Sequence, residues 1–259
     1  MGEALIVRRG DETAELLIDR GSRRNALTQA MWEKIPSLLA PLAEDPQVKL
    51  LLIAGEGGMF SSGADVSEFA AMVADPFRRA ANVEAIHGAL EALARFPKPV
   101  IARIEGDCIG AACGLALACD LRYATPDARF AIPPAKLGLV YTFPQTKALI
   151  DLIGPGHAKA LLLTGDAIDA AEALRIGLVN GVVASAEMAA HVARLSARMA
   201  ALSQHSLRQM KRMMGMVREG VMEETAETRA MFLMSYDGPD HAEGLAAFQE
   251  KRKPLFPVR

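Results

Sequence analysis

Two stretches of the chain have residue types and spacing suited to stabilising a negative charge on an oxygen atom. A β-prone run, Leu50–Ile53, leads into the turn Phe60-Ser61-Ser62-Gly63-Ala64-Asp65, and a second run, Val100–Ile104, leads into Gly110-Ala111-Ala112. Each turn presents backbone N–H groups at the start of a predicted helix, where they carry partial positive charge. A facing pair of such groups can hold the oxyanion that develops on a carbonyl oxygen. Glycine spacing alone is explained at least as well by two ordinary tight turns.

Four competing kinds of site have incomplete motifs. A Walker phosphate loop needs a Gly-Lys-Ser/Thr ending, which the sequence lacks, and a serine nucleophile elbow would need its nucleophile where Ala112 stands. Gly154-Pro155-Gly156 follows no predicted strand and lacks the third glycine of a dinucleotide fingerprint. Cys108, Cys113 and Cys119 crowd one apolar segment without a nearby histidine, which indicates reduced, buried thiols and no metal site. Backbone oxyanion stabilisation remains the best chemical indication.

Composition and charge exclude several classes of protein. The 259 residues are 51% hydrophobic, and 29 Lys and Arg nearly balance 31 Asp and Glu, without a basic block of the kind that binds nucleic acid. The most apolar stretch, Ile109–Leu121, is interrupted by Gly110 and Gly114 and is too short to cross a bilayer. The N-terminal residues resemble neither a signal peptide nor a transit peptide. We therefore expect a cytoplasmic protein that binds neither membrane nor nucleic acid.

Alternating strands and helices must position the two turns. Leu5–Val7 and Thr13–Ile18 predict a β-hairpin across Arg9-Gly10-Asp11. Thr28 predicts the N-cap of a helix over Gln29–Leu42. Recurring strands, glycine-rich turns and helices indicate repeated ββα units with parallel pairing between units. The further predicted elements are strands at Val48–Ile53, Val100–Ile104 and Leu121–Ala124, helices from about Val66 and over Ala80–Phe96, and a helix that opens within Gly106–Gly114.

The last third of the sequence is predicted to be helical. The helical stretches are Gly156–Thr164, Ala170–Arg175, Ala186–Leu202, Ser206–Arg218 and Met222–Met234. Seven of the 13 methionines lie in the last two stretches. Because methionine packs adaptably, core filling is favoured over a subunit contact or the wall of an acyl pocket.

An ordered series of motifs along nearly the whole chain resembles the enoyl-CoA hydratase/isomerase (crotonase) family. The motifs are Arg24-Asn25-Ala26-Leu27, Phe60-Ser61-Ser62-Gly63-Ala64-Asp65, Lys98-Pro99-Val100-Ile101-Ala102, the run from Gly110 to Asp120, Leu163-Thr164-Gly165, Ala173-Leu174-Arg175-Ile176-Gly177-Leu178-Val179 and the run from Glu243 to Pro254. The resemblance implies an α/β fold: a crotonase-like spiral of repeated ββα units over residues 1–190, which carries the acyl-CoA site, and a C-terminal helical trimerisation region over 191–259. It also implies a homotrimer or homohexamer.

The resemblance further implies an acyl-CoA substrate, with coenzyme A as part of that substrate and no separate cofactor. The thioester oxygen would lie between the backbone N–H groups of Ser62 and Ala111. Coenzyme A would pass residues of the first turn and of the C-terminus, the latter from the same or a neighbouring subunit. These coenzyme-binding candidates are Arg23, Arg24, Ala64, Asp65, Val66, Lys253 and Phe256.

The sequence departs from the family at the residues that transfer protons. Hydratases of the family add water with two glutamates, and these positions align with Gly114 and Pro134, neither of which can transfer a proton. Tyr141 and His87 are candidates to replace them, because both fall in segments that line the acyl pocket of relatives. A packed core histidine is the alternative interpretation for His87.

Three functions remain open on this sequence. The first is an acyl-CoA enzyme that stabilises a thioester enolate and uses a base other than the usual glutamates. The second is a non-hydratase acyl-CoA-binding protein without acid–base chemistry. The third is a structural oligomer without a ligand, which the coenzyme-facing motifs make the weakest.

Overall fold

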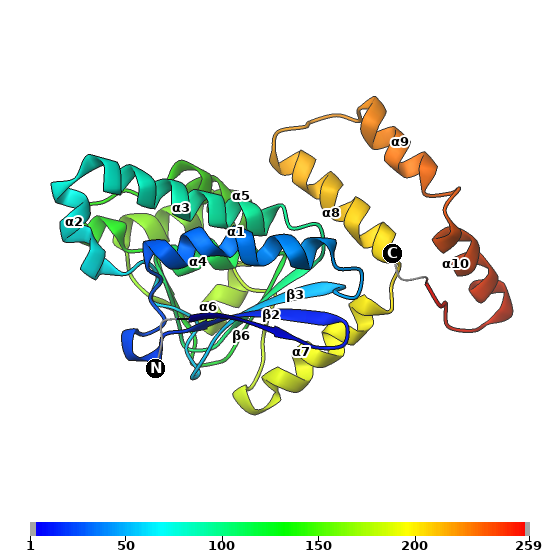
Figure 1. Cartoon of the computed structure of the whole chain (residues 1–259), viewed down its shortest axis with the longest axis horizontal. Coiled ribbons are helices and arrows are strands. Elements are labelled where there is room, and N and C mark those ends of the chain that lie inside the picture. The colour runs from blue at the N-terminus through cyan, green and yellow to red at the C-terminus, as the bar shows by residue number, and fades with distance from the viewer. Residues whose placement is uncertain (1–3, 257–259) are drawn as a thin grey trace.

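The computed structural model describes residues 4–256 and contains two β-sheets with helices on both sides (Figure 1). The larger sheet has the order β1-β2-β3-β4-β6-β9. Its strands are β1 (Ala4–Arg9), β2 (Thr13–Asp19), β3 (Leu50–Gly55), β4 (Val100–Ile104), β6 (Leu121–Ala124) and β9 (Gly181–Val182). β1 and β2 form the predicted antiparallel hairpin, and each later strand pairs in parallel with its neighbour, which confirms the parallel pairing between units.

A second, three-stranded sheet has the order β5-β7-β8. Its strands are β5 (Asp107–Ile109), β7 (Arg129–Ala131) and β8 (Ile168–Asp169). Each strand has three residues or fewer, so none has a periodicity that the sequence could reveal. Because β5 follows β4 and ends where the second glycine-rich turn begins, this small sheet positions that turn.

The helices divide between the two faces of the larger sheet. Figure 1 shows α1 and α3 above the sheet and α7 below it. The helices are α1 (Gln29–Glu44), α2 (Phe69–Ala74), α3 (Pro76–Ala94), α4 (Ala111–Leu117), α5 (Phe143–Thr164), α6 (Ala170–Arg175), α7 (Ser185–Ala200), α8 (Gln204–Arg218), α9 (Ala226–Met234) and α10 (Pro239–Glu250). Short 3-10 turns lie at Gly21–Arg23, Val66–Glu68 and Pro134–Leu137.

Helix α1 shows how local sequence fixes an element. The Thr28 hydroxyl accepts a hydrogen bond from Met31 N–H, as expected of an N-cap. At the other end the buried Lys98 ammonium donates to the Leu42 and Asp45 carbonyls at 2.7 and 2.6 Å. This cation donates to carbonyls that have no hydrogen-bond donor within the helix. Its positive charge also interacts favourably with the negative end of the helix dipole. Burial lowers the pKa of Lys98 to about 8.

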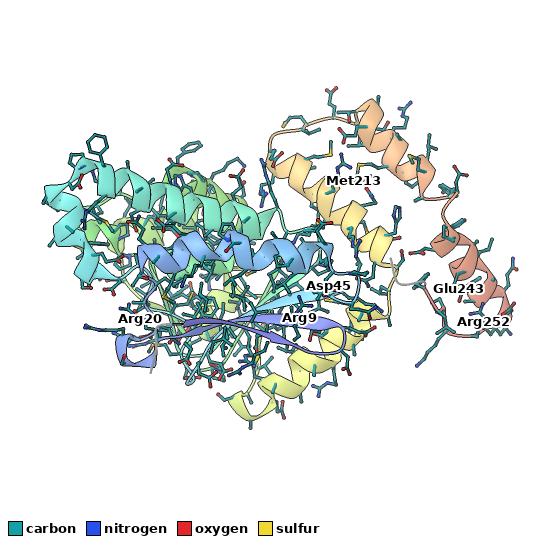
Figure 2. All side chains as sticks on the ribbon, in the orientation of Figure 1. Arg9, Arg20, Asp45, Met213, Glu243 and Arg252 are labelled. Atoms are coloured by element: carbon teal, nitrogen blue, oxygen red, sulfur yellow. The ribbon has the colours of Figure 1, made fainter. Side chains whose placement is uncertain are left out.

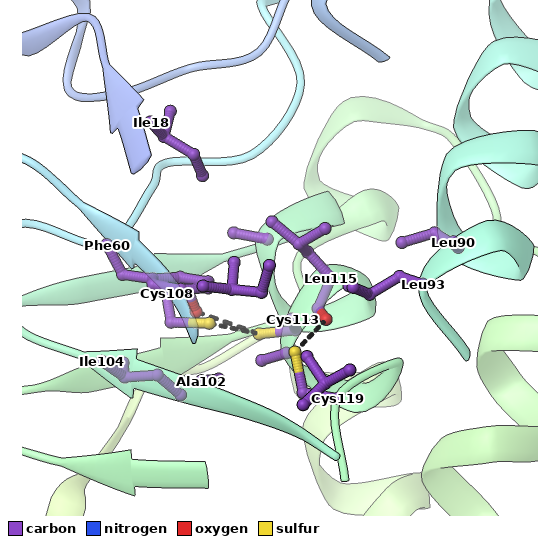
Figure 3. Packing of buried hydrophobic residues seen from close by; sticks show 14 of the residues in the cluster. Ile18, Phe60, Leu90, Leu93, Ala102, Ile104, Cys108, Cys113, Leu115 and Cys119 are labelled. Carbon is purple, nitrogen blue, oxygen red and sulfur yellow. Dashed lines mark hydrogen bonds between the residues drawn. The ribbon is translucent and has the colours of Figure 1, made fainter. Parts of the chain in front are cut away.

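The core between the sheets and helices contains all three cysteines. Figure 3 shows Leu90 and Leu93 of α3 beside Leu115 of α4, and the cysteine side chains packed around them. Cys108 Sγ and Cys113 Sγ lie 3.9 Å apart as thiols, and burial raises the pKa of Cys119 to about 12. The prediction of reduced, buried thiols is confirmed.

The C-terminal helices form an arm that leaves the body of the molecule. Helices α8, α9 and α10 extend away from the sheets (Figure 1). The predicted boundary at residue 190 falls inside α7, which packs against β3. Interpreting the methionines as core filling is wrong within one chain, because many large apolar side chains of the arm are exposed. They include Met210 (51%), Met214 (64%), Met222 (92%) and Met234 (68%).

Candidate active site

The two glycine-rich turns meet in the structure. Ser61 N–H donates to the Asp107 carbonyl at 2.9 Å, and Ile109 N–H donates to the Ser61 carbonyl at 3.1 Å, which joins the first turn to β5. Gly63 has a φ of +92°, and a Cβ there would lie 2.5 Å from the Ile109 oxygen and 3.0 Å from the Ala111 nitrogen. Only glycine combines that φ with so close an approach. Gly63 therefore holds the first turn against the start of α4.

The turn around Gly63 directs its backbone N–H groups to different sides. Ser62 N–H donates to the Arg24 carbonyl at 3.0 Å, and Asp65 N–H donates to the Leu27 carbonyl at 2.9 Å. Ala64 N–H, between them, has no acceptor within residues 4–256. This geometry corrects the expected donor, because the Ser62 N–H is already used and the available N–H belongs to Ala64.

The second N–H group lies at the first residue of α4. Gly110 has a φ of +60° and a ψ of −117°, and its N–H donates to the Ala131 carbonyl of β7 at 2.8 Å. Ala111 follows as the first helical residue, where an N–H has no partner inside the helix. In the described part of the chain, Ala111 N–H also has no acceptor outside the helix. The two turns thus bring two unused N–H groups to one place.

Of the coenzyme-binding candidates, those near the first turn differ in availability. Arg23 and Arg24 are exposed, and the Arg24 guanidinium bonds to the buried Asp107 carboxylate. Asp65 is buried and forms an ion pair with Arg20 at 2.5 Å. Burial alone would raise the pKa of Asp65, but hydrogen bonds from Ser67 and Arg20 outweigh it and lower the pKa to about 2. The Asp65 side chain therefore stabilises the turn, whereas Ala64 is half-buried and Val66 is 61% exposed.

The two candidates at the C-terminus belong to the arm. Lys253 is exposed, and Phe256 lines a hollow beside α10. Figure 2 shows Arg252 at the far end of the molecule from Arg20, whose side chain pairs with Asp65 of the first turn. Within one chain, the segment that carries Lys253 and Phe256 therefore lies far from the first turn.

Gly114 and Pro134 belong to elements that adjoin the second turn. Gly114 is three residues after Ala111 on α4, and a Cβ there would lie 2.4 Å from Gln145 Nε2 and 3.3 Å from Leu90 Cδ1. Pro134 begins a 3-10 turn three residues after β7, which pairs with β5. The space at Gly114 is therefore filled by the Gln145 side chain from α5.

Three polar side chains around α4 have buried atoms without a hydrogen-bond partner within residues 4–256. The atoms are Tyr141 Oη, Gln145 Nε2 and His87 Nε2. Burial raises the pKa of Tyr141 well above its usual range, and the adjacent Cys113 and Cys108 raise it further, so the hydroxyl keeps its proton at neutral pH. His87 lies one helical turn before Leu90, which contacts the position of Gly114.

Comparison with known proteins identifies the family. The model of the family described as "Enoyl-CoA hydratase/isomerase" matches residues 9–259 of the sequence. The chain belongs to the enoyl-CoA hydratase/isomerase family. A crotonyl-CoA hydratase from Syntrophomonas wolfei is 36% identical, with 98% of each protein covered. The 2,3-dehydroadipyl-CoA hydratase of Escherichia coli is 32% identical, with 98% of this chain and 99% of that protein covered.

Solved structures of the enoyl-CoA hydratase/isomerase family show the same fold. A family protein from Hyphomonas neptunium has a TM-score of 0.94 at 39% identity, with 98% of this chain and 97% of that chain covered. The predicted crotonase fold is confirmed, with two sheets and C-terminal helices. Family membership makes the chain an acyl-CoA enzyme.

Two features of the site have no signal in the sequence. They are the unused N–H of Ala64 and the packing of the Gln145 side chain against Gly114. A glycine at position 114 and a long amide side chain at 145 are complementary in size, but 31 positions separate them in the sequence. Within residues 4–256, no group of three or more His, Cys, Asp or Glu side chains is placed to hold a metal ion, and no helix could span a membrane.

Proposed function

We propose that this family member binds an acyl-CoA thioester with its carbonyl oxygen between Ala64 N–H and Ala111 N–H, and that it stabilises the enolate of that thioester. The observation that carries the proposal is Gly63, which holds the first turn against the Ala111 nitrogen and leaves both N–H groups without an acceptor in the described chain. Two fixed donors at a developing oxyanion need no reorganisation as charge appears.

The residues around these donors suit an enolate. The side chains of Ala64 and Ala111 are methyl groups, so a thioester can approach the backbone closely. Removing one such donor lowers turnover by roughly 100- to 1,000-fold in other enzymes. The Tyr141 hydroxyl keeps its proton and acts as a hydrogen-bond donor, and His87 Nε2 is the nitrogen that we assign as proton acceptor.

Coenzyme A is proposed to extend past the first turn from the oxyanion hole, which is formed by Ala64 N–H and Ala111 N–H. The Arg23 and Arg24 guanidinium groups are exposed there and attract phosphate. Lys253 and Phe256 would complete the coenzyme site from a neighbouring copy of the chain, which the exposed apolar arm supports. We therefore propose a homotrimer or a homohexamer as the functional assembly.

Water addition by two carboxylates is not part of this proposal. Gly114 and Pro134 have no ionisable side chain, and the Gln145 amide fills the space at Gly114. The reaction is therefore a different conversion that passes through an enolate. The alternative function, an acyl-CoA-binding protein without acid–base chemistry, is favoured by the same absence of ionisable side chains at Gly114 and Pro134.

The proposal is tested by mass spectrometry of crotonyl-CoA and butyryl-CoA after incubation with the protein in heavy water. Carbon-bound deuterium without added water is the expected result, and Ala111→Pro should slow its incorporation by about 100-fold or more because one donor is lost. Proline is well tolerated at a first helical position. Ala226→Pro at the start of α9 is the matched control and should retain full exchange.

Other outcomes separate the two functions. Binding of the thioesters without exchange would favour the binding protein. Hydration of crotonyl-CoA at an enzymatic rate would contradict the loss of two-carboxylate chemistry. Unchanged exchange in both His87→Ala and Tyr141→Phe would remove these residues from the mechanism.

A further inference from the structure

A hollow of about 370 Å³, termed the α7 hollow, lies between α7 and the larger sheet, on the face opposite α1 and α3 (Figure 1). Strands β2, β3 and β4 form one side of it, and one face of α7 forms the other. This face of α7 carries alanines at positions 189, 193 and 197, whose methyl groups are too small to fill the space against the sheet. No residue of the proposed thioester site lines the α7 hollow in the described part of the chain.

Ser196 has a buried hydroxyl group without a hydrogen-bond partner. The residue is 5% exposed, and its Oγ atom has no partner within residues 4–256. A serine inside a helix usually bonds to the carbonyl four residues earlier or points to solvent, and Ser196 does neither. It lies one helical turn from Val192 and from Ala200, and all three line the α7 hollow. The hydroxyl therefore faces the hollow, where a ligand can supply its missing partner.

The sheet side of the hollow has more acidic than basic groups. Arg103 is the only cation among the described residues that line it, and Glu15 lies beside it at 3.4 Å. The same guanidinium lies 3.2 Å from the Glu105 carboxylate. One positive charge is thus shared by two carboxylates, and these three side chains are only 17–27% exposed. A negative charge without full compensation at a partly desolvated site attracts a cation.

A second uncompensated carboxylate lies at the edge of the hollow. Glu12 lines the hollow but pairs with Lys49 at 2.5 Å. Asp11, at the bend of the β1–β2 hairpin, is exposed and forms no ion pair within residues 4–256. The hollow therefore offers two places for a positive charge, one at Glu15 and one at Asp11.

Ser196 and Glu15 both lie toward the middle of the hollow. Lys49 Nζ donates to the Ala200 carbonyl at 3.2 Å, which places the end of α7 beside the start of β3. Ser196 lies one helical turn before Ala200, a rise of about 6 Å. Glu15 pairs with Leu52 of β3, which follows Lys49 by three residues, about 10 Å along the strand. The serine hydroxyl and the Glu15 carboxylate can therefore bind the same group.

The rest of the lining is largely apolar and suits a short hydrocarbon chain. It consists of Leu52 from β3 and of Val192 and the alanines from α7. Asp11 and Glu15 are four residues apart, which is at most about 13 Å along an extended strand. A chain of four or five methylene groups spans this distance when each end carries an ammonium group that donates to a carboxylate at about 2.8 Å.

We propose that the α7 hollow binds an aliphatic diamine, with one ammonium group held by Glu15 and Ser196 and the other by Asp11. The ammonium N–H groups supply the donor that the Ser196 oxygen lacks and the charge that both carboxylates lack. An anion is repelled by the same carboxylates, and an uncharged ligand leaves them uncompensated. The site does not depend on the proposed function, because it shares no residue with the thioester site.

Titration calorimetry with 1,4-diaminobutane, 1-aminobutane and 1,4-butanediol tests the proposal, because these probes share a four-carbon chain and carry two, one and no charges. The diamine should bind at least about tenfold more tightly than the monoamine, since each hydrogen bond between charged groups contributes about a factor of ten or more. The diol should show no binding. Added salt should weaken binding of the diamine.

Variants locate the site. Glu15→Gln keeps the shape of the side chain and should lower the affinity for 1,4-diaminobutane about tenfold or more. Ser196→Ala should lower it about fivefold and leave thermal stability unchanged, because the hydroxyl has no partner within residues 4–256. Glu91→Gln is the matched control: Glu91 pairs with Arg95 on α3, on the opposite face of the sheet, and the variant should keep the full affinity. If Glu15→Gln does not fold, Asp11→Asn at the exposed hairpin bend removes the other carboxylate and should also weaken binding.

The remaining outcomes each count against the proposal. Equal affinity for the monoamine and the diamine overturns the assignment of two ammonium positions. Unchanged affinity in both Glu15→Gln and Ser196→Ala shows that the diamine binds elsewhere and overturns the site. Absence of binding by 1,4-diaminobutane overturns the proposal as a whole and leaves the thioester chemistry unaffected.

Discussion

Replacing Gly114 by alanine tests the packing of Gln145 against α4. The new Cβ would lie 2.4 Å from Gln145 Nε2 and 3.1 Å from its Cδ, against 3.4–4 Å for an ordinary contact, so the amide must move by about 1 Å. Overpacking of this kind costs about 1–3 kcal/mol. Weakening the 2.9 Å hydrogen bond from the Thr142 hydroxyl to Gln145 Oε1 costs about 1 kcal/mol more, and alanine returns about 1 kcal/mol of helix propensity. The expected net loss is about 1–3 kcal/mol.

For a chain of this size the loss corresponds to a decrease of roughly 3–10 °C in Tm. Thermal unfolding should be followed at one fixed protomer concentration, because assembly makes Tm depend on concentration. The decisive comparison uses Gln145→Ala as a second background. There the overlap is gone, and Gly114→Ala should stabilise the protein by about 1 kcal/mol through helix propensity alone.

The sign of the Gly114→Ala effect should therefore reverse between the two backgrounds. This reversal is a coupling of about 2–4 kcal/mol between positions 114 and 145. If Gly114→Ala raises Tm in both backgrounds, the amide does not fill the space beside Gly114. That result would refute the described packing of Gln145 against α4.

Three further predictions concern the proposed oxyanion hole, the first turn and the C-terminal arm. Gly63→Ala forces a φ of +92° on alanine and places its Cβ 2.5 Å from the Ile109 oxygen, so it should cost about 2–4 kcal/mol in thermal unfolding and lower deuterium exchange at least about tenfold. The pKa of Asp65 is about 2 in the folded protein, against 3.8 for an unperturbed aspartate. Ionisation of Asp65 therefore contributes about 2 kcal/mol to the free energy of unfolding above pH 4. Because the folded pKa is the lower one, this contribution is lost as pH falls from 4 toward 2, and the Tm difference between wild type and Asp65→Asn should shrink over that range. Met214→Asp places a charge on the exposed face of α8, and sedimentation should show a smaller assembly than the wild-type protein forms.

Much of the fold could be predicted from sequence because local signals agree with the tertiary structure. The hairpin, the Thr28 cap and helix α6 at Ala170–Arg175 were all expected with nearly the observed bounds. Helix α3 begins at Pro76, earlier than predicted, because the Asp75 side chain caps the N–H groups of Phe77 and Arg78. That signal, a capping aspartate before proline, was present in the sequence.

The site was less predictable because it depends on backbone direction and distant contacts. The change of N–H direction between Ser62 and Ala64 follows from the φ of Gly63, which glycine permits but does not require. Gln145 reaches Gly114 only because α5 packs against α4. Neither fact has a local signature, so the sequence does not reveal that Ser62 N–H is bonded, that Ala64 N–H is unused, or that the amide packs against Gly114.

The contact between Gln145 and Gly114 also constrains how this sequence can evolve. A glutamate introduced at position 114 would place its Cβ 2.4 Å from the end of the Gln145 side chain, so the amide must move for that substitution to be accommodated. A shorter side chain at position 145 removes that requirement but offers no new chemistry by itself. Substitutions at positions 114 and 145 are therefore expected to depend on each other, although the two residues lie on different helices.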